Sequence, residues 1–336
     1  MLIAGAMALA CSNDIENEGA RTAELEILID NNVEDMTKAT TVATSAEKAV
    51  SSLKVYVYNE KGELEANPAV TSQRATANVV AGVKTIVAVA NAEVSSSDAA
   101  SLSGIRSAVT TLSENAGAFV MSGLTPGVSV SENTSVSVHL KRRTAKVCLV
   151  SVSRNLSDAS LASASLVIKD VFLSNVAGTT GMVDEQSPSE VGTWFHKMGY
   201  GHVKGTDCPT GIQLEATVNQ SLAQGDTYST EHVFYAYPNS SSSDVKATSE
   251  SSTWSPRTTR LVIAAELAGS VTYYVIPVFK GGKGIEANKV YNIQANLTSS
   301  GSLSPDGAGE TSPQFGVELI VSVDDWDDAI AIVQDI

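Results

Sequence analysis

Alternating hydrophobic and polar residues predict short strands along the whole chain, with one at each end. One face of residues 23–30 is aliphatic and consists of Leu25, Ile27 and Ile29. One face of residues 328–336 carries Ile330, Ile332 and Ile336. A period of two is typical of a half-buried strand. Chain ends usually fray unless something holds them, so we expect the apolar last strand to dock onto another surface.

Strands also dominate the rest of the chain. They are predicted at residues 53–58, 79–81, 83–90, 118–121, 135–140, 144–152, 164–173, 260–265, 271–278, 290–297 and 317–323. One helix is expected over residues 97–112, capped by Ser96 or Ser97, since apolar residues recur there at spacings of three and four. Many short strands, turns rich in Ser, Gly and Pro, and one short helix predict a mostly all-β chain built as β-sandwiches.

Length and charge narrow the possible functions. A chain of 336 residues exceeds the comfortable size of one core, which favours two domains. The 22 basic and 37 acidic residues give a net charge of −15, which argues against binding nucleic acid. The basic cluster Lys141–Arg143 lacks interleaved aromatic residues, so we interpret it as an interdomain joint whose cations offset nearby acids.

The first residues have the pattern of an export signal. The apolar run of residues 2–10 is too short to cross a bilayer, which takes about 20 residues, but suits the core of a signal peptide. It ends at Cys11, placed directly after a small residue, where lipoprotein processing attaches the lipid. Ala8 stands where leucine is usual, and no basic residue precedes Leu2, so we expect the true start to lie upstream. A buried N-terminal strand is the alternative interpretation.

Two further cysteines leave the redox state open. Cys148 lies in a predicted strand, where a buried thiol is the simplest interpretation. Cys208 lies in a stretch rich in turn residues. In an exported protein the two could form a disulfide.

Several segments occur in an order that resembles a known family. They are residues 53–58, 83–92, 119–122, 141–147, 273–277, 288–293 and 321–326. From about Ala23 to the C-terminus, the chain resembles the major fimbrial subunits (fimbrillins) of Bacteroides-like bacteria, which build type V pili. The acidic residues 12–18 resemble the export signals of surface lipoproteins in such bacteria.

The resemblance implies two transthyretin-like β-sandwich domains and a lipoprotein precursor in the outer membrane that becomes part of a cell-surface fimbria. It implies a signal peptide at 1–11, a tether and removable first strand at 12–38, and sandwiches at 39–140 and 141–336. The resemblance also implies that a protease removes the first strand (Leu25, Ile27 and Ile29) and that the C-terminal strand (Ile330, Ile332 and Ile336) of the next subunit takes its place. The expected partners are identical or homologous subunits and the maturation protease. Membrane contact is expected only through the lipid of the precursor.

The cleavage site departs from the family pattern. The resemblance implies a cut after arginine between the first two strands, yet residues 31–52 contain only Lys38 and Lys48 as basic residues. Arg21 precedes the first strand, so a cut there would not release it. We expect cleavage after Lys38, in a polar stretch.

No residue pattern predicts an enzyme, a metal site or a cofactor. The four histidines (His139, His196, His202 and His232) lack the spacing of a zinc site. The acidic residues around Trp326 lack the spacing of a calcium loop and are expected to protect a sheet edge (Asp324, Asp325, Asp327 and Asp328).

Two alternatives remain open from the sequence. A monomeric surface lipoprotein could bind glycans through aromatic residues in long loops, namely Trp194, Tyr200 and Trp254. A tip or anchor subunit of the same pilus is the other. The apolar C-terminal strand favours a shaft subunit, because neither a monomer nor a tip needs a donor strand.

Overall fold

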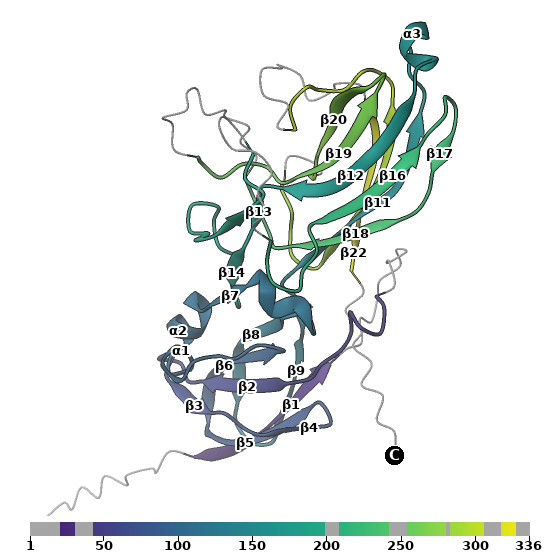
Figure 1. The fold of residues 1–336 in the computed structure, drawn as a ribbon. Coiled ribbons are helices and arrows are strands. Elements are labelled where there is room, and N and C mark those ends of the chain that lie inside the picture. Colours follow the sequence, from purple (N-terminus) through teal and green to yellow (C-terminus); the bar gives the residue numbers. More distant parts are fainter. Residues whose placement is uncertain are drawn as a thin grey trace, which may run out of the picture.

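The chain folds into two halves that lie end to end (Figure 1). The computed structural model describes residues 21–30, 43–198, 208–241, 254–279, 283–305 and 317–326. Within these ranges, no helix has the length and apolar character needed to cross a membrane. Several predicted site residues lie outside the described residues: Cys11, Lys38, Tyr200, His202, Asp327, Asp328, Ile330, Ile332 and Ile336.

The N-terminal half is a sandwich of two sheets. One has the order β4 (Val70–Thr71), β5 (Arg74–Val80), β1 (Thr22–Asp30), β9 (Thr134–His139). The other has the order β10 (Lys141–Arg142), β8 (Met121–Val130), β6 (Gly82–Ala90), β2 (Leu53–Tyr58), β3 (Leu64–Ala66). Buried and exposed residues alternate strictly along β5, as expected for a strand with one face on the core.

One apolar cluster fills this sandwich and extends to the other half. It joins the inward side chains of β1 and β5 to those of β2 and β6, among them Val57 and Ile86. The same cluster contains Phe119, Cys148 and Trp326, which lie toward the C-terminal half. The core of the N-terminal sandwich and the region between the halves are therefore packed as one body.

The prediction of one continuous helix over residues 97–112 is wrong. The structure instead has α1 (Ser96–Ala99), α2 (Leu102–Ser107), strand β7 (Val109–Thr111) and the 3₁₀ helix η1 (Leu112–Ala116). The side chains of Ser95 and Ser101 cap α1 and α2 by accepting backbone N–H groups, so the second serine begins a new helix within the expected one. Ala108 is extended, and β7 pairs with β14 (Thr179–Gly181).

The two short helices cover the outer face of β2 and β6. Tyr56 and Val87, which point away from the sandwich core, pack with Ile105 of α2 in a second cluster. This packing explains why the ends of β2 and β6 are buried on both faces rather than alternating.

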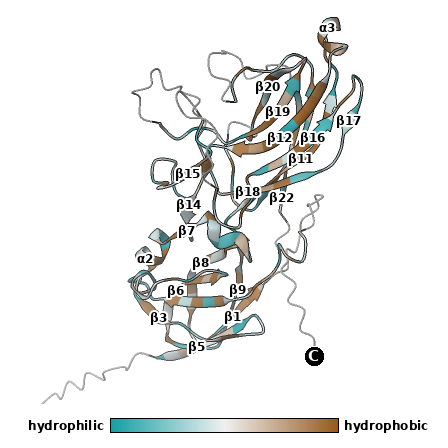
Figure 2. Ribbon diagram, viewed as in Figure 1, coloured by the Kyte–Doolittle hydropathy of each residue, from teal (hydrophilic) through white to brown (hydrophobic). Residues whose placement is uncertain are grey.

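The C-terminal half is a second sandwich. One sheet has the order β17 (Thr227–Tyr228), β11 (Ala145–Arg154), β21 (Lys289–Leu297), β22 (Val317–Asp325), with β18 (His232–Ala236) also paired to β11. The other has the order β16 (Glu215–Ser221), β12 (Leu166–Ser174), β19 (Arg260–Leu267), β20 (Ser270–Pro277). Helix α3 (Ala159–Ala162) precedes β12. Hydrophobic residues run along the strands of both halves (Figure 2).

The halves meet through backbone pairing and buried polar contacts. The β7–β14 pair joins them directly, and a smaller pair, β13 (Val176–Ala177) with β15 (Trp194–Phe195), lies beyond it. Tyr237 donates its hydroxyl hydrogen to the carbonyl of Thr111 at 2.8 Å and accepts from Asn115 Nδ2 at 2.9 Å. Arg143 Nε donates to the carbonyl of Gly181 at 3.1 Å, so the basic cluster contacts β14 where it pairs with β7.

The mostly β fold is confirmed, and its details differ from the sequence pattern in several places. β16 and β18 were not predicted, because their alternation is weak: β16 is exposed along much of its length. The strand expected at residues 118–121 instead starts at Met121 and continues through Pro126 with a register shift opposite β6. The division into domains at residue 141 stays a prediction.

Candidate functional site

The first strand lies inside a sheet rather than at its edge. β1 pairs antiparallel with β5 from Thr22 to Leu28 and parallel with β9 from Leu25 to Asp30. The backbone N–H and C=O groups of β1 therefore form hydrogen bonds with β5 on one side and with β9 on the other. Without β1, the facing edges of β5 and β9 would be left unpaired, which is unfavourable for the sheet and makes it ready to accept another strand.

The inward face of β1 closes the hydrophobic core. Leu25 and Ile27 are fully buried, and Ile29 is 3% exposed. Alanines stand opposite them on β5, where Ala77 pairs with Leu25 and Ala75 with Ile27. Small wall residues leave the space that the large side chains fill. We call this site, bordered by β5 and β9 and filled by β1, the strand slot.

Polar contacts fix β1 at its ends and on its outer face. The backbone N–H of Ile29 donates to the carbonyl of Gln73 at 2.8 Å, and that of Ala81 to the carbonyl of Arg21 at 2.8 Å. On the outer face, Arg74 Nη1 lies 2.8 Å from Glu26 Oε1. Both side chains of this pair are well exposed, so its contribution to stability is small.

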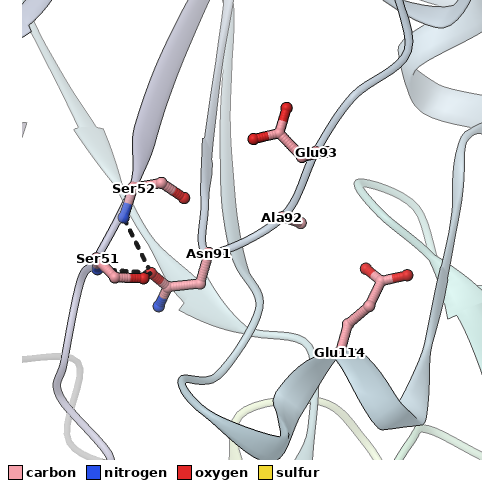
Figure 3. Close-up of a pocket in the computed structure, with 6 residues that line it drawn as sticks. All are labelled: Ser51, Ser52, Asn91, Ala92, Glu93 and Glu114. Atoms are coloured by element: carbon pink, nitrogen blue, oxygen red, sulfur yellow. Dashed lines mark hydrogen bonds between the residues drawn. The ribbon is translucent and has the colours of Figure 1, made fainter.

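The chain that follows the slot is fixed by Asn91, which is located at the end of β6 (Figure 3). Asn91 Oδ1 accepts hydrogen bonds from the backbone N–H of Ser51 at 2.8 Å and of Ser52 at 3.3 Å. Asn91 Nδ2 donates to the carbonyls of Ala49 and Phe119, both at 2.8 Å. Asn91 has a left-handed backbone (φ 60°), which asparagine tolerates better than most residues. This one amide holds residues 49–52 in place independently of β1.

Glu47 is a second anchor on the same stretch. Its carboxylate accepts hydrogen bonds from the backbone N–H of Thr44 at 2.7 Å and from the hydroxyl of Tyr235 at 2.7 Å, and it lies 2.9 Å from Lys146 Nζ. Tyr235 and Lys146 belong to β18 and β11 of the C-terminal half. The residues that follow the strand slot are thus bound to the second half of the molecule.

Electrostatics keep Glu47 ionised. Burial alone would raise the pKa of Glu47, but hydrogen bonds from Thr44, Lys146 and Tyr235, with the charge of Lys146, bring the pKa below its ordinary value of 4.5. For Tyr235, burial and the adjacent Glu47 raise the pKa of the phenol, so its hydroxyl remains a donor.

The two inner cysteines are thiols rather than a disulfide. Cys148 is buried, and burial raises the pKa of its thiol to about 12. Cys208 is exposed, and its Sγ lies 3.2 Å from Nε2 of the buried His196. The disulfide that the sequence left open is therefore absent.

The aromatic residues considered for glycan binding are not an exposed platform in the described residues. Trp194 is buried and packs against the half-buried Trp254 with ring centroids 5.3 Å apart. The Trp254 indole N–H donates to the carbonyl of Met198 at 3.0 Å. Both rings contribute to the core of the C-terminal half.

The acidic residues before Trp326 contact β21. Asp324 accepts a hydrogen bond from Asn292 at 3.1 Å, and Asp325 pairs with Lys289. Among the described residues, no group of three or more His, Cys, Asp or Glu side chains is placed to hold a metal ion.

The sequence pattern predicted the apolar face of β1 but neither its pairing with β5 and β9 nor the anchors Asn91 and Glu47. Leu25, Ile27 and Ile29 lie together in the slot as expected. Asn91 and Glu47 were missed, because most of their partners are far away in the chain: Phe119 is 28 positions from Asn91, and Tyr235 is 188 positions from Glu47. The only local signal was the asparagine directly after a strand, a common place for a left-handed residue.

Comparisons with known proteins give a consistent result. Residues 23–187 match the family described as major fimbrial subunit protein (FimA). A comparison with curated proteins finds no match. The fold is similar to a solved structure of a candidate cell adhesion protein from Parabacteroides distasonis, with a TM-score of 0.62 and 17% identity over 91% of this chain and 97% of that chain. It is also similar to a fimbrilin (FimA) from Porphyromonas gingivalis W83, with a TM-score of 0.57 and 15% identity over 91% of this chain and 98% of that chain. At these identities the structures show a shared fold.

The strand slot predicts different effects for two neighbouring positions of β1. Ile27→Ala should lower the free energy of unfolding by about 2–5 kcal/mol, because it leaves a cavity in the apolar cluster that β1 closes. Leu28→Ala, on the half-buried outer face, should change it by about 1 kcal/mol or less. Urea denaturation of the uncleaved chain measures both, and equal losses would contradict the assignment of faces.

Glu47 predicts a pH-dependent contribution to stability. Because its pKa is lowered on folding, the carboxylate stabilises the folded state above pH 4.5, and this contribution is lost as the pH falls through the folded pKa. Glu47→Gln should therefore cost about 1–3 kcal/mol at pH 7 and less at pH 3. Thermal melts of both proteins at the two pH values test this; a difference that grows in acid would contradict it.

Proposed function

Residues 23–187 belong to the major fimbrial subunit (FimA) family, and we propose that the chain is a shaft subunit of a cell-surface fimbria that polymerises by exchange of strands. The family is structural rather than enzymatic. In this mechanism a protease removes β1, and the C-terminal strand of the next subunit fills the strand slot. The observation that carries the proposal is the position of β1, paired on both sides and closing the core.

The proposed donor strand is suited to the slot in length and pattern. β1 has nine residues, and so does the segment 328–336. Ile330 and Ile332 would take inward positions like those of Leu25 and Ile27, and Ile336 would lie on the same face beyond Gln334. Three such side chains at about 1.5–3 kcal/mol each would contribute about 5–9 kcal/mol, and backbone pairing with β5 and β9 would fix the register.

Exchange of this kind gives a filament. The surface that donates, a C-terminal strand, differs from the surface that accepts, the strand slot. Such a head-to-tail contact does not close on itself when two subunits meet, so each addition leaves a new end for the next. The precursor is proposed to be a lipoprotein of the outer membrane, lipidated at Cys11, before it joins the fimbria.

Lys38 is our proposed cleavage site. A cut at Arg21 would leave β1 attached, because this residue precedes the strand. Lys48 lies in a turn, and its backbone N–H donates to the carbonyls of Thr44 and Ser45 at 3.1 and 3.2 Å. A hydrogen-bonded turn opposes entry into a protease active site, which requires an extended chain. Residues downstream of the cut are then held by Glu47 and Asn91.

Proteolysis should trigger assembly. Limited digestion of the purified chain with a lysine-specific protease should give ladders on unboiled gels, since a vacated slot accepts a tail. Lys38→Gln should remain monomeric, and Lys48→Gln should assemble like the unmodified chain. Mass spectrometry confirms the cut. Monomer that persists after complete cleavage at Lys38 would rule out the mechanism and leave a monomeric surface protein or a tip subunit.

The donor strand predicts opposite outcomes for adjacent substitutions. Ile332→Asp should abolish ladders, because it places a charge in the apolar slot. Ala331→Asp lies on the outer face of the same strand and should assemble normally, because β1 itself carries an acidic residue, Glu26, on its outer face. Gel ladders after cleavage measure both, and assembly by a chain lacking residues 328–336 would remove the donor role from this segment.

A further inference from the structure

The residue that precedes the proposed donor tail is deeply buried between the halves. Trp326 follows β22 and is 1% exposed. Its backbone is held on both sides by Asn288: Trp326 N donates to the carbonyl of Asn288 at 3.1 Å, and Asn288 Nδ2 donates to the carbonyl of Trp326 at 3.2 Å. The position of this residue in the subunit is therefore fixed by its own main chain.

Three side chains surround the indole ring. Tyr235 stacks on it with ring centroids 5.9 Å apart and an interplanar angle of 9°. Phe119 meets it edge-on with centroids 5.5 Å apart, and the guanidinium carbon of Arg142 lies 4.6 Å from the ring centre. Stacked, edge-on and cation–π contacts each restrict the orientation of the ring. Phe119 and Arg142 come from the N-terminal half, and Tyr235 from the C-terminal half.

The same side chains hold the chain that follows the strand slot. Arg142 Nε donates to the carbonyl of Glu47 at 2.9 Å, while the Tyr235 hydroxyl donates to the carboxylate of Glu47 at 2.7 Å. We call Glu47, Phe119, Arg142, Tyr235 and Trp326 the joint cluster. Both segments that take part in the proposed exchange, the one downstream of the cut and the one that leads to the tail, meet in this cluster.

We propose that the joint cluster is the root of the donor tail and that Trp326 is its positioning residue. This inference rests on the proposed function. When the residue at the base of the tail is fixed, every encounter starts from one place, so less conformational entropy is lost when the tail enters a neighbouring slot. If the base of the tail were mobile, more conformational entropy would be lost on binding, and subunits would join more slowly.

If Trp326 only stabilised the fold, its substitution would slow exchange whether the altered subunit donates or accepts a strand. The experiment therefore uses different chains as donor and acceptor. The acceptor is a cleaved, fluorescently labelled chain lacking residues 328–336, which has an empty slot and no tail. The donor is the cleaved, unlabelled whole chain. The rate at which label moves into larger species on unboiled gels reports donation alone.

With Trp326→Ala in the donor, we expect this rate to fall at least tenfold. With Trp326→Ala in the acceptor, we expect it to stay within twofold of the unmodified pair. Trp326→Phe in the donor, which keeps a ring beside Tyr235, should fall between these values and tests the same point if the alanine variant does not fold. Thermal melts of each variant monitor folding.

The outcomes separate the two hypotheses. If the unmodified pair transfers no label, the proposed exchange itself fails. If the unmodified pair reacts but Trp326 substitutions slow donor and acceptor equally, or slow neither, exchange stands and the root role is overturned.

Discussion

The need to pair every backbone group of a sheet interior governs this molecule. β1 supplies partners to β5 on one side and β9 on the other, and its aliphatic face completes the core between them. A strand in that position cannot be lost without replacement, because both neighbours would then expose unpaired edges beside an open hydrophobic groove. The proposed function follows from this constraint. The sheet needs a strand at this position, and in the proposed mechanism a strand of similar pattern from another subunit takes the place of β1.

Local periodicity was sufficient where a strand has one face on a core and one on solvent. β1 follows that rule, and Leu25, Ile27 and Ile29 are buried as the alternation indicates. β5 also alternates, but the sequence analysis predicted only its end, at residues 79–81. Local periodicity failed over residues 97–112, where apolar residues at helical spacing are divided among two short helices, a strand and a 3₁₀ turn. The competing interaction is β7 with β14, a pairing across about 70 positions that no local pattern can reveal.

Long-range contacts also explain why only part of the site was predictable. The basic cluster Lys141–Arg143 was interpreted as an interdomain joint whose cations offset nearby acids. Arg142 Nε and Arg143 Nε instead donate to the backbone carbonyls of Glu47 and Gly181, and no local sequence pattern predicts these contacts. Likewise, the loop tryptophans proposed as a sugar platform are core residues. An aromatic residue in an irregular stretch is as easily an anchor for that stretch as a surface for a ligand.

One apolar cluster contains both the inward face of β1 and Trp326. The occupant of a slot and the base of the subunit's own tail are therefore packed in the same continuous body. In the proposed exchange, a subunit that has received a neighbour's strand would regain its full core, and this core would support the base of its own donor tail. An empty subunit lacks part of that support. Growth is then expected to be cooperative, with an occupied end extending more readily than two isolated subunits combine.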